Sequence, residues 1–368
     1  MFNSMLDILS LCIITTYTYF IVFIILGLFK HKVLPVSSSK ELPVVSVVIA
    51  ARNEEKNLPD ILRDLIRQEY PIEKLEVIIV NDRSGDSTSE ILDDASRNYL
   101  FIKALNVESK SKVMTPKKYA LQLGIERAKG EIIILTDADC RVNKLWVSSM
   151  VYGVLERDSI IIGFSKISTD GNTWFEHYQK IDFLSIIAAN AGAAGWNRFW
   201  SGTGQNLAFY KDDFFLINGF DPVKDELSGD DMYLVQSISK IKNAYLHIDP
   251  NSFVKTSSMP RIKDFINQRI RWSSNAKKSL QSIPEFFLFL LIIFSYNSHL
   301  MLSLLFGGSW ILLLLLKLFL EGLVLFLGGR LFNTNINMRG FLIWSLIQPF
   351  YIPIIGILGI RGKFSWKP

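Results

Sequence analysis

An acidic triplet has the residue types and spacing needed to act on a phosphorylated substrate. Asp137 and Asp139 flank Ala138 directly after the apolar run EIIILT at 131–136. Carboxylates two residues apart on one side of an extended chain suit a hard divalent cation, Mg²⁺ or Mn²⁺. A cation held there would bridge a diphosphate and offset the charge of a leaving nucleotide. The alternative is an ordinary loop with two solvated acids.

A second acidic pair, Asp230 and Asp231, follows Ser228 and Gly229. Gly229 allows a close backbone approach, and the pair heads a helix that we expect over 232–239. Repulsion between adjacent carboxylates raises one of their two pKa values, which suits a general base. Asp is also a preferred helix N-cap, so capping is the alternative role.

The segment 260–284 is basic and amphipathic. Its apolar stripe consists of Ile262, Phe265, Ile266 and Ile270, and its basic residues are Arg261, Lys263, Arg269, Arg271, Lys277 and Lys278. A basic amphipathic helix beside a membrane segment is expected to lie at the bilayer surface. Within the sequence QRIRW at 268–272, Arg271 could contact a diphosphate and Trp272 could stack on a sugar ring. The alternative is an interfacial anchor, with Trp and Arg at the level of the headgroups.

Alternating strands and helices position these acids. Short apolar runs predict strands at 44–50, 75–80, 101–105 and 131–136. Apolar periodicity and turn residues predict helices at 58–68, from about 88, and at 118–129. This alternation predicts a parallel α/β sheet, in which ligands bind beyond the carboxyl ends of the strands. Two strand ends carry acids there, Asp82 with Asp86 and Asp137 with Asp139, and no glycine-rich phosphate loop follows the first strand.

Apolar runs at both ends of the chain are long enough to cross a membrane. Residues 8–29 carry no charge, and residues 286–316 continue to 329, with Gly307 and Gly308 as a turn between two crossings. About 20 apolar residues span the hydrocarbon core. Lys317 and Glu321 fall inside the second of these crossings, and we expect them to form a local ion pair. A polar contact to a lipid or glycan is the alternative role.

Charge asymmetry predicts the orientation of these segments. The first run is followed by Lys30, His31, Lys32 and Lys40, which places the N-terminus outside and the next domain in the cytosol. The last apolar run, 340–360, contains the helix-disfavouring residues Pro349, Pro353, Gly356 and Gly359. Three positive charges follow it: Arg361, Lys363 and Lys367. The positive-inside rule therefore predicts a re-entrant or interfacial segment here, with a full crossing as the alternative.

The composition argues against several other classes of protein. The chain has 368 residues, 49% of them hydrophobic, and a net charge of +5, with the charged residues concentrated in the middle. Excess Lys and Arg is typical of the cytosolic loops of membrane proteins, and nucleic-acid binding is not expected. The two cysteines, Cys12 and Cys140, lie far apart and the four histidines are scattered, so neither a disulfide nor a zinc site is expected.

Together these segments resemble the membrane-bound branch of glycosyltransferase family 2, which includes hyaluronan, chitin and cellulose synthases and ceramide glucosyltransferases. The resemblance runs from about Val44 to Trp272. VSVVIAARNEEKNL looks like the family's first strand and nucleotide-binding turn, and VIIVNDRSGDST looks like its second strand with a uridine-contacting Asp. The segment 117–130, the DxD triplet, SGTGQNLAFYKDDFFLINGFD at 201–221, the DD pair and Q-x-x-R-W follow in the family's order. Most of 169–205 has no match.

The resemblance implies the GT-A fold, an α/β domain with a mixed, mostly parallel sheet, joined to N-terminal and C-terminal transmembrane helices. It implies inversion at the anomeric carbon, with Asp231 as the base beside Asp230, and a metal held by Asp139 and Asp137. The donor-binding residues carried over are Ala51, Asn53, Glu54, Asp82, Lys117, Asp137 and Arg271. The acceptor-binding residues carried over are Gln268, Trp272 and Gly204.

Four regions are expected: a transmembrane helix (1–30), a cytosolic GT-A domain (31–258), an interfacial helix with QRIRW (259–284) and a membrane region of two or three segments (285–368). The expected protein belongs to the inner or plasma membrane and to cell-envelope glycan synthesis. It moves a sugar from a nucleotide sugar, a UDP-sugar by family analogy, to a hydroxyl of a lipid or lipid-linked glycan. A processive polysaccharide synthase is the alternative, although such enzymes have more crossings. The intact acids disfavour a non-catalytic partner, and the few crossings disfavour a transporter.

Overall fold

The computed structural model describes residues 2–33 and 41–362, which fall into two compact units. The α/β unit comprises residues 32–166 and 201–257, and the helical unit comprises residues 1–31, 167–200 and 258–368. Lys40, Lys363 and Lys367, whose charges entered the expected orientation, lie outside the described residues. Residues 167–200 group with the helices, whereas the sequence suggested one continuous domain over 31–258.

A seven-stranded mixed sheet forms the centre of the α/β unit, in the order β3-β2-β1-β4-β8-β6-β9. The parallel part consists of β3 (Ile102–Val107), β2 (Leu75–Asp82), β1 (Val45–Ala51) and β4 (Ile132–Leu135). β8 (Leu207–Tyr210) runs antiparallel to β4 and to β6 (Ile160–Gly163), and β9 (Ala244–His247) is parallel to β6. A smaller sheet contains β5 (Cys140–Arg141), β10 (Val254–Thr256) and β7 (Ser165–Ile167). The expected mixed, mostly parallel sheet is confirmed.

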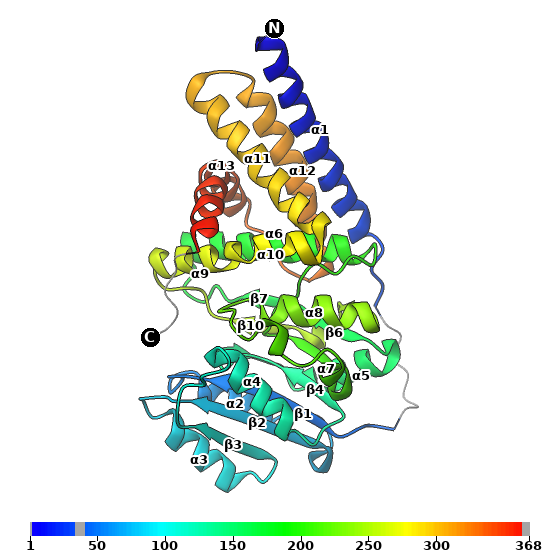
Figure 1. The fold of residues 1–368 in the computed structure, drawn as a ribbon, viewed down its shortest axis with the longest axis vertical. Helices are drawn as coiled ribbons and strands as arrows, with labels where there is room; N and C mark the ends of the chain where they lie inside the picture. The colour runs from blue at the N-terminus through cyan, green and yellow to red at the C-terminus, as the bar shows by residue number, and fades with distance from the viewer. Residues whose placement is uncertain (1, 34–40, 363–368) are drawn as a thin grey trace. The chain divides into compact units, whose positions relative to one another are not determined.

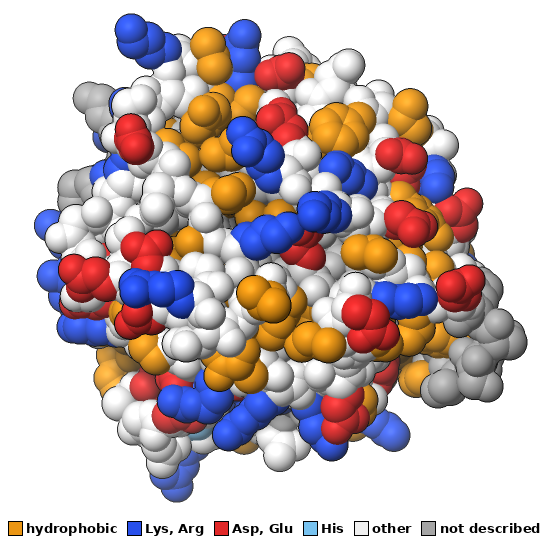
Figure 2. Space-filling view, turned by 90° about the horizontal axis from the view of Figure 1, so that it is seen from below, with side chains coloured by type: hydrophobic (Ala, Val, Ile, Leu, Met, Phe, Trp, Pro, Cys, Tyr) orange, Lys and Arg blue, Asp and Glu red, His pale blue; other side chains and the backbone are white. Residues whose placement is uncertain are grey.

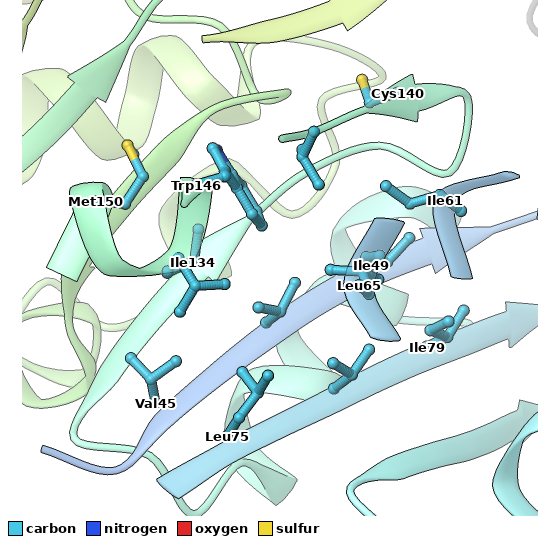
Figure 3. Packing of buried hydrophobic residues seen from close by; sticks show 14 of the residues in the cluster. Val45, Ile49, Ile61, Leu65, Leu75, Ile79, Ile134, Cys140, Trp146 and Met150 are labelled. Carbon is cyan, nitrogen blue, oxygen red and sulfur yellow. The ribbon is translucent and has the colours of Figure 1, made fainter. Parts of the chain in front are cut away.

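Helices cover both faces of the parallel strands, which explains their continuous apolar sequences. One face packs against α2 (Leu58–Ile66), α3 (Thr88–Asn98) and α5 (Trp146–Arg157). Figure 3 shows Leu65 of α2 close to Ile49 of β1, and Trp146 and Met150 of α5 in the same cluster. The other face packs against α4 (Pro116–Arg127), where a Cβ added to Gly124 would lie 2.5 Å from Cγ1 of Val48. Because Gly124 has no side chain, α4 approaches the sheet closely.

The remaining helices of this unit are α7 (Lys211–Leu216) and α8 (Asp230–Ile241), with short 3₁₀ turns at Ile72–Lys74, Asp221–Val223 and Pro250–Ser252.

On the face of the molecule drawn in Figure 2, basic and acidic side chains alternate, with hydrophobic groups between them. Neither sign of charge forms a continuous patch on that face, which is the pattern of an ordinary water-exposed surface.

The helical unit contains four helices long and apolar enough to cross a membrane, among the residues described. They are α1 (Phe2–Leu28), α11 (Pro284–Phe306), α12 (Trp310–Leu331) and α13 (Met338–Arg361). Three further helices are α6 (Trp174–Ala194), α9 (Ile262–Ser274) and α10 (Ala276–Ser282). In Figure 1, α1, α11 and α12 run side by side, and α6 and α10 run across them.

The contact between α1 and α6 explains why residues 167–200 belong to the helical unit. A Cβ added to Gly27 would lie 1.8 Å from the carbonyl oxygen of Gly192, so the two backbones touch. Trp196 donates a hydrogen bond from Nε1 to the carbonyl of Phe23 at 2.9 Å, and His31 Nε2 lies 2.7 Å from the carbonyl of Ala191. The small residues of NAGAAG permit this crossing, which sequence periodicity did not reveal.

Lys317 and Glu321 form the expected ion pair on α12, with Nζ 2.6 Å from Oε2. Tyr17 of α1 also donates a hydrogen bond to Oε1 of Glu321 at 2.8 Å. Both charges are buried, so they satisfy each other inside the apolar bundle. The pair therefore joins α12 to α1 as well as stabilising its own helix.

Two expectations for the C-terminal third require correction. The run 340–360 was expected to be irregular, but α13 continues as one helix through Pro349 and Pro353. Both prolines are buried and lie four residues apart on one face, so the missing N–H groups fall on the side packed against other helices. The stretch 259–284 forms two helices rather than one, because Asn275 ends α9 and begins α10.

Candidate active site

The turns after β1 and β2 are joined by hydrogen bonds between side chains and backbone. The backbone N–H of Asn53, whose φ is a left-handed 54°, donates to the hydroxyl oxygen of Ser84 at 2.9 Å. The N–H of Gly85 in turn donates to Oδ1 of Asn53 at 2.9 Å. The backbone N–H of Glu54 donates to the hydroxyl of Thr88 at 2.9 Å. Two carboxyl-end turns of the sheet therefore form one braced edge, which starts from Ala51 at the end of β1.

Asp82 ends β2 at this edge and is 5% exposed. Its carboxylate accepts two hydrogen bonds from Arg83, at 2.8 and 3.1 Å, and lies 3.7 Å from Nη1 of Arg52. Glu54, which is also buried, accepts a hydrogen bond from the amide of Asn57 at 2.6 Å. Four of the seven predicted donor-binding residues thus lie at the ends of β1 and β2: Ala51, Asn53, Glu54 and Asp82.

A second group of predicted residues surrounds the ammonium of Lys117, on α4. Its Nζ donates to Oδ1 of Asp137 at 2.9 Å and lies 3.8 Å from Oδ2 of Asp230. Burial opposes the charge of this ammonium, but the attraction of Asp137, Asp230 and Asp231 raises the pKa of Lys117 above its ordinary value. Lys117 therefore stays charged and links the acidic triplet after β4 to the acidic pair on α8.

Asp231 has the environment of a general base. Its Oδ2 accepts the backbone N–H of Gly204 at 3.2 Å, and its Oδ1 accepts the N–H of Met232 at 2.8 Å. Burial, followed by repulsion from Asp230, raises the pKa of Asp231 to about 6. A carboxyl group with that pKa is ionised near neutral pH and still accepts a proton readily.

The capping alternative for the acidic pair is not borne out. The N-cap residue of α8 is Gly229, whose φ is 87°, so neither acid occupies the N-cap position. Glycine suits this position because, having no Cβ, it adopts a positive φ without a steric clash. The two acids instead occupy the first turn of α8, where the helix dipole favours negative charge.

Asp137 and Asp139 provide the oxygen donors that a divalent cation requires. Within the described residues no three His, Cys, Asp or Glu side chains gather into a metal site of their own. Mg²⁺ is commonly held by one or two carboxylates together with substrate phosphates, so two acids beside an open strand end fit it. The chemistry of the donor set therefore agrees with a cation that binds together with a phosphorylated substrate.

Gln268, Arg271 and Trp272 lie on α9, in the helical unit, and are half-buried. The predicted apolar stripe of α9 needs correction, because Ile262 is 55% exposed whereas Arg269 is 4% exposed. Arg269 is buried because its Nε donates to Oδ2 of Asp182 on α6 at 2.8 Å. Sequence reasoning missed Asp182, although the capping box of Thr173 and Glu176 could have revealed the start of α6.

Comparison with known proteins agrees with this arrangement of the α/β unit. Residues 46–225 match the family described as Glycosyl transferase family 2. This part of the chain belongs to glycosyltransferase family 2. The matched range runs from within β1 through β8 and includes the donor-side edge, Lys117 and the acidic triplet, whereas Asp230, Asp231 and α9 follow it.

Among curated glycosyltransferases, a probable glycosyltransferase of Bacillus subtilis (strain 168), YdaM, is 26% identical over 290 residues, covering 76% of this chain and 68% of that protein. The beta-monoglucosyldiacylglycerol synthase of Trichormus variabilis (strain ATCC 29413 / PCC 7937) is 37% identical over 101 residues, 27% of this chain and 21% of the synthase. The chain thus matches only about a fifth of that synthase.

Among solved structures, the mannosyltransferase PcManGT of Pyrobaculum calidifontis, in complex with GDP-Man and Mn²⁺, aligns with a TM-score of 0.62 at 16% identity. The alignment covers 97% of this chain and 99% of the mannosyltransferase. At 16% identity this structural likeness shows a common fold alone, and it agrees with the GT-A fold expected from the sequence.

Proposed function

We propose that this family 2 glycosyltransferase transfers a sugar from a nucleotide sugar to a hydroxyl group of a lipid or lipid-linked acceptor, with inversion at the anomeric carbon. The observation that carries the proposal is the half-buried carboxyl of Asp231, held by the N–H of Gly204 and set beside Asp230 and Lys117. A single base with a raised pKa suits direct displacement, in which one carboxylate removes the acceptor's proton.

In the proposed reaction, Asp231 takes the proton from the acceptor hydroxyl while the hydroxyl oxygen attacks C1 of the sugar. The bond between C1 and the diphosphate oxygen breaks, and the nucleoside diphosphate leaves from the opposite side. Asp137 and Asp139 would hold Mg²⁺ or Mn²⁺, which supplies positive charge to the leaving diphosphate. Lys117 would supply a second fixed positive charge, and Arg271 on α9 would assist it.

The donor would bind at the braced edge after β1 and β2. The nucleotide would lie against Ala51, Asn53 and Glu54, with Asp82 beside its base. Because Asn53 is fixed by Ser84 and Gly85, this edge is formed before the donor arrives. Such preorganisation lowers the entropy cost of binding and of orienting C1. Gln268, Trp272 and Gly204 would contact the acceptor.

A membrane acceptor is favoured by the helical unit. Its four long apolar helices fit an integral membrane protein, and one relative is named a beta-monoglucosyldiacylglycerol synthase. We propose that α1, α11 and α12 cross the membrane, with the N-terminus outside and the α/β unit in the cytosol. α13 would lie at the cytosolic surface, where Arg339 and Arg361 at its two ends obey the positive-inside rule.

A processive polysaccharide synthase remains the second candidate, because a related protein from Staphylococcus epidermidis is named a poly-beta-1,6-N-acetyl-D-glucosamine synthase. That protein is 35% identical over 111 residues, which cover 25% of its length. Product length separates the candidates: single addition gives one product per acceptor, whereas a processive enzyme gives a ladder of chain lengths.

A donor panel tests the proposal. The full chain, purified with native lipid, is assayed for binding of UDP-sugars and GDP-sugars by calorimetry with Mn²⁺, with Mg²⁺ and with EDTA. We expect cation-dependent binding of one donor and its loss in the double variant Asp137→Asn, Asp139→Asn. Asp94→Asn, on the surface of α3, is a matched control with unchanged binding. Equal donor binding with EDTA and in the double variant would contradict the role given to the triplet.

A further inference from the structure

Arg269 lies inside the sequence QRIRW but faces away from solvent. Phe265 and Arg269 are the buried residues of α9, and the guanidinium of Arg269 lies 4.4 Å from the centre of the Phe265 ring. Asp182 on α6 is equally buried, at 4% exposed, and accepts the Nε hydrogen bond of Arg269 at 2.8 Å. The ion pair between Arg269 and Asp182 therefore lies on the buried side of α9, between this helix and α6.

The side chain of Arg269 contacts both flanking motif residues. Its Nη1 donates a hydrogen bond to Oε1 of Gln268, and its guanidinium lies 4.2 Å from the centre of the Trp272 ring. Phe183, which follows Asp182 on α6, lies 6.0 Å from the Trp272 ring. One guanidinium thus fixes Gln268 on one side and the indole of Trp272 on the other.

α13 completes the arrangement by holding Asp182. The second carboxylate oxygen of Asp182, Oδ1, accepts hydrogen bonds from Nε1 of Trp344 at 3.3 Å and from Nε2 of Gln348 at 3.2 Å. α13 also lies against the end of α9, where a Cβ added to Gly359 would lie 2.4 Å from Oγ of Ser273. Helices α6, α9 and α13 therefore meet at one carboxylate.

We propose that Asp182 and Arg269 are positioning residues that set the orientation of Gln268 and Trp272, with α13 as their support. A buried ion pair contributes little net stability compared with apolar residues of the same volume, so its distinctive contribution is a fixed geometry. The planar fork of arginine bonds a carboxylate and stacks on an aromatic ring at the same time, which lysine cannot do. The inference rests on the proposed function only in giving Gln268 and Trp272 a role toward the acceptor.

Fluorine NMR of the full chain labelled with 5-fluorotryptophan tests this directly. Trp272→Phe identifies the Trp272 resonance among those of the eight tryptophans. In Asp182→Asn we expect the resonances of Trp272 and Trp344 to shift and broaden, and that of Trp146 in the α/β unit to stay. An unchanged Trp272 resonance in Asp182→Asn would overturn the proposal.

Glu321→Gln is the matched control, because it breaks another buried ion pair of the helical unit while keeping Asp182 and Arg269. Lys317 of that pair lies 5.4 Å from the centre of the Trp344 ring, so the Trp344 resonance can shift in this control. It should leave the Trp272 resonance in place, and an equal shift there would mean that any loss of buried charge disturbs Trp272, which also overturns the proposal. Gln348→Met is a milder second variant that keeps both charges in case Asp182→Asn does not fold. It should shift Trp272 in the same direction by a smaller amount.

Kinetics separate this inference from the proposed function. With vesicles of a total polar lipid extract as acceptor, Arg269→Lys should lower the transfer rate at subsaturating lipid roughly 10- to 100-fold and leave the donor KM unchanged. If the NMR shifts occur while Trp272→Ala transfers sugar at the wild-type rate, the acceptor role of Trp272 fails and the positioning pair stands. If Trp272→Ala is inactive while Asp182→Asn leaves its resonance unmoved, the positioning pair fails alone.

Discussion

At the scale of single residues, the chemistry depends on how charges are distributed around Lys117. This ammonium lies 2.9 Å from Asp137 and 3.8 Å from Asp230, so three of the predicted residues form one electrostatic unit. The sequence predicted each acid from its place at a strand or helix end. The role of Lys117 as their link depends on how α4 packs on β1 and β2, which no local pattern contains.

The pKa of Asp231 predicts the acid limb of the pH profile. Because burial raises that pKa to about 6, the base becomes protonated as the pH falls through 6, and kcat/KM falls with it. We expect roughly a tenfold loss for each pH unit below that point. Initial rates at low donor concentration, measured from pH 5 to 8, test the slope. A flat profile between pH 5 and 7 would contradict the assignment of Asp231 as the base.

At the scale of elements, close backbone contacts fix where the helices meet the sheet. Gly130, after α4, is one such contact: a Cβ added there would lie 2.4 Å from the N of Ser46 and 2.6 Å from the carbonyl carbon of Val45. The N–H of Gly130 donates to Oγ of Ser46 at 2.9 Å, and that hydroxyl donates to Glu76. The start of β1 and the end of α4 are held together through this glycine.

Gly130→Ala is therefore expected to destabilise the α/β unit by about 1–3 kcal/mol, the usual cost of forcing extra volume into packed structure. Thermal unfolding in detergent should show a lower midpoint. Gly85→Ala is the matched control, because a Cβ added at Gly85 has no atom within 4 Å. Equal midpoints for Gly130→Ala and wild type would show that the contact is looser than described.

The helices and strands also show which parts of the fold can be predicted from the sequence. The strands at 44–50 and 75–80 and the helix at 58–68 were predicted within about two residues, because buried runs such as LEVIIV and the spacing of Leu58, Ile61 and Leu65 have clear periods. Helix α6 was missed, because Asp182 interrupts its apolar face and its small residues pack against α1. The continuity of α13 was missed because proline statistics from soluble helices do not hold where neighbouring helices bury the free carbonyls.

At the scale of the whole molecule, the proposed orientation places charged connections in the cytosol. Lys277 and Lys278 precede α11, Arg330 and Arg339 flank the turn before α13, and the turn Gly307–Ser309 between α11 and α12 has no charge. The positive-inside rule then puts this uncharged turn outside. In the proposed orientation the α/β unit is cytosolic, where nucleotide sugars are supplied.

Cysteine labelling in intact cells tests this orientation. In a Cys12→Ser background, the remaining Cys140 is buried and should not react. Ser309→Cys is expected to react with a membrane-impermeant maleimide from outside, and Ser282→Cys only after the cells are opened. Labelling of Ser282→Cys in intact cells, with Ser309→Cys protected, would reverse the proposed topology.

The central claim is that Asp231 acts as the base of a nucleotide-sugar transferase. We would measure donor binding and nucleoside diphosphate release in wild type and Asp231→Asn, with native lipid and Mn²⁺. The account predicts that Asp231→Asn binds the donor as wild type does but releases the diphosphate on the order of 10²–10⁴ times more slowly. Release at the wild-type rate by Asp231→Asn, or wild-type protein that binds no nucleotide sugar, would contradict it.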